Sequence, residues 1–418
     1  MIIDAGKENI PAVIDEISSN IDTDYNIAVV IPCLNEPDII DLLKNLEDNN
    51  STLNKVIVII IINSSINATS EIIQNNLYTY NKILFYHSQN FKINFLPINI
   101  INIPEKIAGA GFARKIGMNI ASTFFNKNNK DGIIISLDAD CKVEKNYLFE
   151  IENTFLKNND ISIGIIYFEH PIEGNEFPEN IYKATTLYEL HLRYHIEKLK
   201  YINFPYPYHT IGSCFAIKSS IYQKSGGMNT RKAGEDFYFL HKIFPLGKVV
   251  EINTTCVYPS PRISNRVPFG TGPTIKNIIK NKLNYTTYNP YSYEDLKKFF
   301  DSIDLLYKNQ IDFVVKNLNE CLRNFLISNN FDKKIHEIKS NTSNFASFKK
   351  RFFNWFNAFK IIKYLNYVHN NNYYNKIDII EAILSIIKKN KNHGLVNDPV
   401  ILLKYLREIQ RRQNITFQ

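Results

Sequence analysis

The sequence has few cysteines, no hydrophobic run long enough to cross a membrane, and almost no glycine or proline in its last third. Its five cysteines form no CxxC pair and are too sparse for a disulfide framework, which makes a reducing cytoplasm the expected location. The longest apolar run, VIVIIII at 56–62, has the length of a strand, whereas a membrane span needs roughly 18 residues. The opening MIIDAGKENI carries acids and no apolar segment, so no signal peptide is expected.

The chain is long enough for one large domain with an appendage, or for two domains of ordinary size. It has 418 residues and a mass of 48.6 kDa. Hydrophobic residues make up 44% of it and charged residues 22%. These values allow a sizeable core and exclude both a small binding module and a disordered chain.

The formal charge of +8 is concentrated at one end of the chain. Residues 275–418 contain 24 Lys and Arg against 12 Asp and Glu, so the rest of the chain holds 25 against 29 and is mildly acidic. Any general attraction to an anionic partner is therefore expected of the C-terminal part alone.

Glycine and proline mark a change of architecture near Gly272. Only one of the 15 glycines follows it, and only two prolines follow Pro273. Before this point apolar runs alternate with polar helical stretches, as in NIAVVIPC followed by PDIIDLLKNLED, which predicts a largely parallel α/β sheet. After it, apolar residues recur at helical spacing. We predict an N-terminal helical extension at 1–25, an α/β domain at 26–272 and an all-α domain at 273–418.

Polar residues that follow the apolar runs are the candidate site residues, because ligands of an open α/β sheet bind where its strands end. The first such segment is IPCLNE, in which Pro32 ends a strand and Asn35 and Glu36 follow. A strand end followed by a helix N-cap explains the same residues.

The second segment, KIAGAGFARKIGMNIA at 106–121, combines small residues with cations. Lys106 and Arg114 suit a bound diphosphate, and the glycines and alanines allow a close approach. A tightly packed helix explains the small residues nearly as well, and the segment lacks the full G-x-G-x-x-G spacing.

The third segment, IIISLDADCKV at 133–143, delivers two carboxylates at the end of an apolar run. Asp138 and Asp140 lie on the same side of an extended chain, where like charges favour a cation. Hard oxygen ligands suit Mg²⁺ or Mn²⁺ carrying substrate phosphates. A turn after a strand is the alternative.

Two further segments carry charged candidates. Glu235 and Asp236 open a helix in KAGEDFYFLHKI, where they either complement the helix dipole or supply a general base. Arg262 and Arg266 lie in the Pro- and Gly-rich stretch PSPRISNRVPFGTG at 259–272. That stretch is either a lid over a donor diphosphate or a connector to the next domain.

In this order and at these separations, the three segments above and the one that holds Glu235 and Asp236 resemble the family-2 glycosyltransferases of the GT-A fold, a Rossmann-like fold of nucleotide-diphospho-sugar transferases. The resemblance covers roughly residues 26–272. It implies a sugar transfer from a nucleotide-diphosphate donor to a hydroxyl acceptor, with a metal and with inversion. It also implies Pro32 and Glu36 near the nucleobase, Arg114 near the donor, Asp138 near the ribose and metal, Asp140 as a direct metal ligand and Asp236, beside Glu235, as the base.

The sequence departs from this family after its second expected strand. The family commonly has an Asp there that contacts the nucleoside, whereas IINSSINATSE offers Asn63, so UDP and GDP both stay open as the nucleotide. We expect Asn35, Lys106, Arg262 and Arg266 to contribute to the donor site as well. The Q-x-x-R-W motif of processive polysaccharide synthases is missing, which disfavours a processive polymerase.

Two other functions compete with this interpretation. A sugar nucleotidyltransferase also has metal-binding acids, but it needs a glycine-rich basic loop after the first strand, and IPCLNEPD is not one. A degenerate relative would bind sugar nucleotide or a partner without turnover; Asn63 favours it, and the intact Asp138, Asp140 and Asp236 speak against it.

The C-terminal segment FKKRFFNWFNAFKIIKYLNYV at 348–368 interleaves bases with aromatic residues and holds the only Trp. Helix packing, nucleic acid and an anionic membrane surface all fit this pattern. Most aromatics fall on one helical face, which favours packing. For the remaining residues of this segment, we expect a role toward a lipid-linked or membrane-proximal acceptor. The protein is then expected to be peripheral to the inner face of the membrane, and no nucleic acid partner is expected.

Overall fold

The computed structural model describes residues 1–22, 24–86, 93–230, 234–264, 270–387 and 397–412. The chain divides into two compact units, neither of which is one continuous stretch. The first unit takes in 1–185, 210–276 and 407–418, and the second takes in 186–209 and 277–406. The predicted boundaries at 25 and 272 stay predictions.

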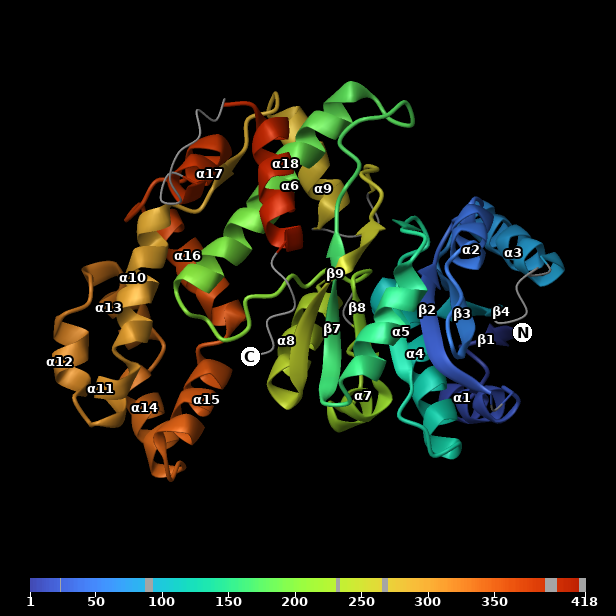
Figure 1. Ribbon diagram of the computed structural model, residues 1–418, viewed down its shortest axis with the longest axis horizontal. Coiled ribbons are helices and arrows are strands. Elements are labelled where there is room, and N and C mark those ends of the chain that lie inside the picture. The colour runs from blue at the N-terminus through green and yellow to red at the C-terminus, as the bar shows by residue number, and fades with distance from the viewer. Residues whose placement is uncertain (23, 87–92, 231–233, 265–269, 388–396, 413–418) are drawn as a thin grey trace. The chain divides into compact units, whose positions relative to one another are not determined.

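In the described part of the first unit, nine strands form one mixed sheet (Figure 1). The strands are β1 (Ile2–Asp4), β2 (Tyr25–Cys33), β3 (Lys55–Ser65), β4 (Ile93–Ile103), β5 (Ile133–Ser136), β6 (Lys142–Val143), β7 (Ile161–Phe168), β8 (Phe215–Lys218) and β9 (Lys248–Tyr258). Their order across the sheet is β1-β4-β3-β2-β5-β8-β7-β9-β6. The first 25 residues thus hold a strand, paired with β4, as well as the helix expected there.

Strand direction brings several chain segments to one edge of the sheet. β1, β4, β3, β2 and β5 are mutually parallel, so their carboxyl ends meet there. β8 runs antiparallel to both β5 and β7, so it begins where β5 ends. β9 is parallel to β7 and therefore also ends at this edge. The loops that follow or precede these strands converge on it as a result.

The helices of the first unit pack on a sheet whose strands β2, β3 and β5 are buried along nearly their whole length. These helices are α1 (Ile10–Ser19), α2 (Ile39–Glu47), α3 (Ser70–Phe85), α4 (Ala110–Lys127), α5 (Tyr147–Lys157), α7 (Ser219–Lys224) and α8 (Glu235–Ile243), with a 3₁₀ turn at Phe244–Leu246. The run at 56–62 is completely or nearly completely buried within β3, as expected of a strand covered on both faces. On α4, a Cβ at Gly117 would lie 2.4 Å from Cγ1 of Val30, so only glycine allows this approach.

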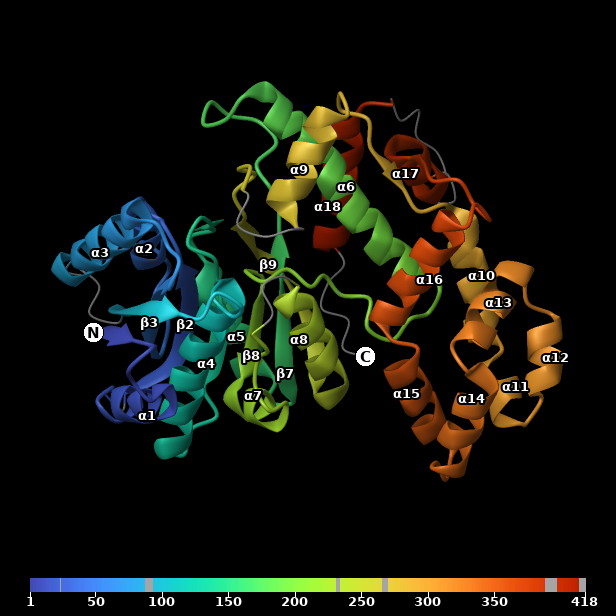
Figure 2. The same ribbon diagram turned by 180° about the vertical axis from the view of Figure 1, so that it is seen from behind.

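The second unit is almost entirely helical (Figure 2). It contains α10 (Pro290–Asp301), α11 (Ile303–Tyr307), α12 (Ile311–Lys316), α13 (Glu320–Ser328), α14 (Phe331–Ser340), α15 (Phe345–Trp355), α16 (Ala358–Asn370) and α17 (Ile379–Ile387), with a small antiparallel ladder of β10 (Thr286–Thr287) and β11 (Ile377–Asp378). Phenylalanines from α10 and α15 pack ring against ring in its core. The buried carboxylate of Asp295 accepts hydrogen bonds from Tyr364 and Tyr374, which ties α10 to α16 and to the segment after it.

Three helices contribute residues to both units: α6 (Glu179–Tyr201), α9 (Thr271–Lys280) and α18 (Pro399–Arg412). In the first unit, Arg411 of α18 bonds the carboxylate of Glu144, and Arg407 donates to the carbonyl of His170. The mixed sheet and the helical C-terminal region confirm the predicted fold class, α/β with an all-α C-terminal part. Among the described helices, none has the length and apolar character needed to cross a membrane.

Candidate active site

A cavity of about 580 Å³ lies at the edge of the sheet where these loops converge. Residues from the predicted segments line it, together with residues that the sequence did not single out. The former are Pro32, Glu36, Asn63, Asp138, Asp140 and Arg262. The cavity thus collects side chains separated by more than 200 positions in the sequence, and all of them belong to the first unit.

Arg262 joins two acidic side chains in this cavity. Its Nη1 donates to Oε2 of Glu36 over 2.9 Å, and its Nη2 also bonds Glu36 and lies 2.8 Å from Oδ2 of Asp140. Burial by itself lowers the pKa of Arg262, but the two carboxylates outweigh it and raise that pKa above its ordinary value. The guanidinium therefore stays charged and is the shared counter-ion of both acids.

Arg114 makes a second bridge, deeper in the fold. Its Nη2 lies 2.5 Å from Oδ1 of Asp138 and its Nη1 lies 2.5 Å from Oε1 of Glu235. The side chain of Arg114 is buried, and its Nε has no hydrogen-bond partner in the described part of the chain. A Cβ at Gly212 would lie 2.7 Å from Nη2, so glycine leaves the room that the guanidinium fills.

The bridge by Arg114 connects the two predicted acidic motifs. Asp138 follows β5, and Glu235 begins α8 at a left-handed Gly234. Burial opposes the charge of Arg114, but Asp138 and Glu235 more than compensate and raise its pKa. Arg114 itself does not line the cavity among the described residues, and both of its terminal nitrogens are engaged by carboxylates. Its predicted place near the donor stays a prediction.

Asp236 is a carboxylate whose pKa lies well above its ordinary value. Burial and the neighbouring charge of Glu235 raise the pKa of Asp236 to about 7, although Arg114 and the backbone N–H of Phe237 act in the opposite direction. Oδ1 of Asp236 accepts that N–H over 2.7 Å. A carboxyl group that titrates near neutral pH is suited to accept a proton in a reaction.

Asp138 and Asp140 fit a divalent cation that takes its other ligands from a bound substrate. Asp138 and Asp140 both line the cavity, each is partly exposed, and each carries an arginine as its present counter-ion. Among the described residues there is no group of three or more His, Cys, Asp or Glu that could hold a metal. Mg²⁺ and Mn²⁺ sites built from one or two carboxylates with substrate phosphates need no such group.

Other predicted residues lie at the margin of the site or away from it. Asn35 has a positive φ of 54°, and its amide groups bond Asn75 and Asn76 of α3, so it does not cap α2. Lys106 is exposed and is not among the described residues that line the cavity. Asn63 lines it and donates to the carbonyl of Gly109 over 3.3 Å. Arg266 lies outside the described residues.

Sequence reasoning missed several residues of the cavity wall. Ser213 reaches it because β8 is antiparallel and begins at this edge. Asn67 and Thr69 line it from the turn before α3, where Thr69 accepts the N–H of Ile72 as an N-cap. The N-cap pattern was readable in the sequence, whereas the position of Ser213 and the role of Gly212 follow from the strand order.

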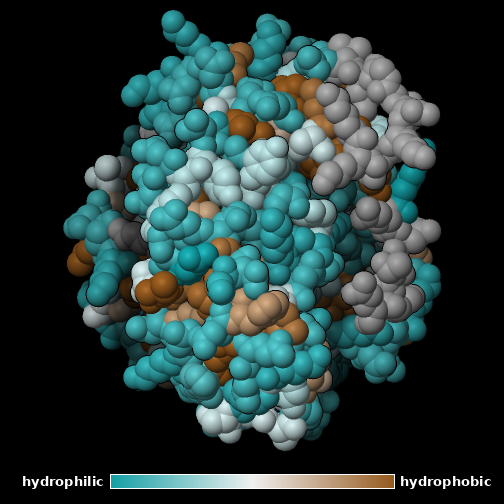
Figure 3. Space-filling model, turned by 90° about the vertical axis from the view of Figure 1, so that its left-hand side faces the viewer, coloured by the Kyte–Doolittle hydropathy of each residue, from teal (hydrophilic) through white to brown (hydrophobic). Residues whose placement is uncertain are grey.

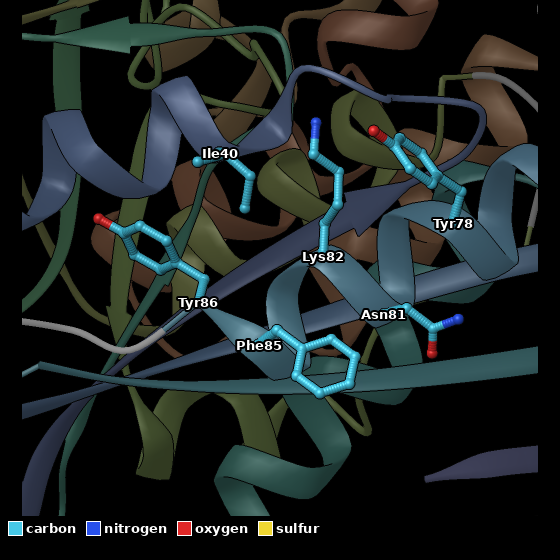
Figure 4. Close-up of a pocket in the computed structure, with 6 residues that line it drawn as sticks. All are labelled: Ile40, Tyr78, Asn81, Lys82, Phe85 and Tyr86. Carbon is cyan, nitrogen blue, oxygen red and sulfur yellow. The ribbon is translucent and has the colours of Figure 1, made fainter.

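A second hollow, of about 410 Å³, lies between α2 and α3 (Figure 4). Its wall is mainly apolar and consists of Ile40, Tyr78, Asn81, Lys82, Phe85 and Tyr86. Among the described residues of this wall Lys82 is the only charged one, and its Nζ lies 5.0 Å from the centre of the Tyr78 ring and donates to the carbonyl of Pro37. Within the same described residues the hollow contains none of the predicted site residues and no acid.

No protein-family model matches the chain, and no curated protein shows significant sequence similarity to it. Solved structures similar to it include S. aureus TarS in complex with UDP-GlcNAc, with 12% identity, a TM-score of 0.37, and coverage of 93% of this chain and 92% of that chain. Another is glucosyl-3-phosphoglycerate synthase from Mycobacterium tuberculosis in complex with Mg²⁺ and UDP, with 12% identity, a TM-score of 0.35, and coverage of 69% of this chain and 91% of that chain. Similarity at this level does not assign a function.

Proposed function

We propose that the protein is a metal-dependent, inverting glycosyltransferase that moves a sugar from a nucleotide-diphosphate donor, with UDP or GDP as the nucleotide, to a hydroxyl acceptor. The observation that carries this proposal is the cavity in which Glu36, Asp138, Asp140 and Arg262 meet at the edge of the sheet. Its volume is within the range of pockets that hold a small organic ligand. The acceptor is a glycan, a lipid-linked sugar or a small molecule.

The donor diphosphate fits the cationic and backbone groups of this cavity. α4 begins at Ala110, and the adjoining Ala108 and Gly109 also line the cavity, so the helix N-terminus is available to a negative charge. Arg262 supplies a positively charged hydrogen-bonding group in the cavity wall. Asp138 and Asp140 would hold Mg²⁺ or Mn²⁺. When bound there, the metal neutralises charge on the leaving diphosphate.

Asp236 is the proposed base. Its ionised carboxylate takes the proton of the acceptor hydroxyl while that oxygen bonds to the anomeric carbon of the donor. The bond between the anomeric carbon and the diphosphate oxygen breaks in the same step, and the nucleoside diphosphate leaves with both electrons. A single displacement from the opposite face inverts the configuration. Glu235 keeps Arg114 in place and so orients the turn that presents Asp236.

A donor panel tests the proposal directly. The protein is incubated with UDP-, GDP- and TDP-sugars and Mn²⁺, and hydrolysis and thermal stabilisation are measured. We expect stabilisation by one nucleotide class, slow donor hydrolysis, and loss of both in Asp140→Ala. Full transferase activity in Asp236→Asn would refute the assignment of the base.

A second candidate function is sugar-nucleotide binding without turnover. The ion pairs of Asp138 with Arg114 and of Asp140 with Arg262 favour it, because both metal-binding acids already have counter-ions. Stabilisation by a donor without any hydrolysis or transfer would support this function over the first. A lack of response to every donor would refute both.

We also propose that the protein resides in the cytoplasm and that its basic helical unit contacts the anionic inner face of the membrane. The excess of Lys and Arg after residue 275 supports this contact. We expect no binding to nucleic acid.

A further inference from the structure

The helical unit carries a long stretch without acidic residues. From Ile338 to Ile377 the sequence contains seven Lys and Arg and no Asp or Glu. α15 and α16 make up most of this stretch. Phe348, Phe352 and Phe356 are completely buried, so the aromatic stripe mainly forms the core, while the bases remain at the surface.

Two lysines of this stretch lie over aromatic rings, one of which belongs to the only tryptophan. Trp355 ends α15, and Nζ of Lys360 lies 4.7 Å from the centre of its ring. One turn further along α16, Nζ of Lys363 lies 4.7 Å from the ring centre of Phe359. Phe359 is 37% exposed. We call Trp355, Phe359, Lys360 and Lys363 the Trp355 patch.

The neighbouring helix α13 contacts the patch at its C-terminal end. Lys360 donates to Oδ1 of Asn329, the residue that caps α13, over 3.1 Å. Near this end of α13, Ile327 is 62% exposed. Figure 3 shows hydrophobic residues at the surface of one face of the molecule, among mainly hydrophilic ones. Isolated exposed apolar residues are common, but Phe359 is exposed beside the cation of Lys363.

The lysines of the patch crowd one another. Burial and the like charges of Lys363 and Lys334 lower the pKa of Lys360, as expected where cations lie close to one another. On the same helix pair, Lys349, Lys350 and Arg351 are exposed and have no ion-pair or hydrogen-bond partner in the described part of the chain. A surface that concentrates unpaired cations favours an anionic partner.

We propose that the Trp355 patch is the surface through which the protein binds an anionic phospholipid membrane. Trp and Phe rings with lysine stems insert at the boundary between headgroups and acyl chains, and the ammonium groups pair with lipid phosphates. The exposed Phe359 favours a lipid surface over nucleic acid, which offers no comparable apolar layer. The proposal locates the membrane contact suggested above and is independent of the catalytic assignment.

Because the chain has one tryptophan, its fluorescence reports on this patch alone. The full-length protein is mixed with vesicles of phosphatidylcholine, with or without an equal amount of phosphatidylglycerol. We expect flotation with the anionic vesicles only, a shift of the Trp355 emission to shorter wavelength, and reversal of both by high salt. Flotation without an emission shift would show that another surface makes the contact. The absence of flotation would refute the membrane contact altogether.

A pair of charge-matched variants completes the experiment. Lys360→Glu with Lys363→Glu should weaken binding to anionic vesicles about tenfold or more. Lys298→Glu with Lys308→Glu changes the net charge equally at exposed positions outside the patch and should bind nearly as the unmodified protein does. Equal weakening of vesicle binding in both variants would refute the Trp355 patch as the binding surface. An emission shift with a single-stranded oligonucleotide but not with vesicles would also refute it. If the first variant fails to fold, the single Lys363→Gln, at an exposed position, replaces it.

Discussion

Arg262 holds Asp140 through a contact of 2.8 Å between Nη2 and Oδ2, and the same guanidinium bonds Glu36. The proposed metal ligand is thus already neutralised by a side chain of the protein. A divalent cation at Asp140 would compete with Arg262, and displacement would free the guanidinium for the diphosphate. Metal and donor binding are therefore expected to respond in opposite directions to the loss of Arg262.

Arg262→Ala should bind Mn²⁺ about 3- to 10-fold more tightly in the absence of a nucleotide, since removing a partly exposed ion pair is worth ~1 kcal/mol. The same variant should bind UDP or GDP more weakly. Calorimetric titration of Mn²⁺ and of the nucleotide measures both effects. Lys44→Ala removes an exposed cation on α2 and controls for the change in net charge. Unchanged Mn²⁺ affinity in Arg262→Ala would contradict the competition.

The two acids of the D-x-D pair should differ in their importance for stability. Asp138 pairs with the buried Arg114, whereas Asp140 pairs with Arg262, which keeps Glu36 as a partner. We expect Asp138→Asn to lower the free energy of unfolding by about 2 to 3 kcal/mol and Asp140→Asn by less than about 1 kcal/mol. Denaturant unfolding without metal measures the difference. Equal losses of unfolding free energy in the two variants would contradict the idea that the more buried Arg114 makes the more stabilising bridge.

Gly212 should tolerate a side chain only when Arg114 is shortened. A Cβ at this position would lie 2.7 Å from Nη2, so Gly212→Ala is expected to cost about 1 to 3 kcal/mol of unfolding free energy. In an Arg114→Ala background the guanidinium is missing and the cost should fall well below that value. Denaturant unfolding of the two single variants and the double variant closes the cycle. Additive losses would mean that Gly212 is required for another reason.

The arrangement of regular elements was predictable, whereas the strand order was not. Buried strands such as that at 56–62 are recognisable because apolar runs covered on both faces lack alternation. The antiparallel β8, which brings Ser213 to the cavity, depends on the pairing of strands distant in sequence. The return of α18 to the first unit, where Arg411 meets Glu144, has the same origin. Local patterns carry no information on such contacts.

The candidate site was predictable as a set of residues but not as a set of contacts. Segment order and strand ends indicated Glu36, Asp138 and Asp140, which all line one cavity. The sequence could not show that Arg114 is buried between Asp138 and Glu235, because a cation near small residues suits a diphosphate equally well. Only the packing of α4 against the sheet decides between these positions.

The protonation of Asp236 should control both activity and stability near neutral pH. Burial and Glu235 raise its pKa to about 7 in the folded protein, from a value near 4 in the unfolded chain. The base acts when ionised, so kcat/KM should rise with pH to a plateau above about pH 7. Asp236→Asn should remove this activity and its pH dependence together.

Stability should show the opposite trend over the same pH range. Between about pH 4 and pH 7 the folded protein keeps a proton on Asp236 that the unfolded chain has released, so its free energy of unfolding falls as the pH rises. Asp236→Asn cannot titrate, so its free energy of unfolding relative to the unmodified protein should rise across this window and stay constant above it. Urea unfolding at several pH values measures this difference. If the difference in unfolding free energy between the two proteins does not change between pH 4 and pH 7, Asp236 is ionised throughout this range. The pH dependence of activity would then have to come from a base with an ordinary pKa.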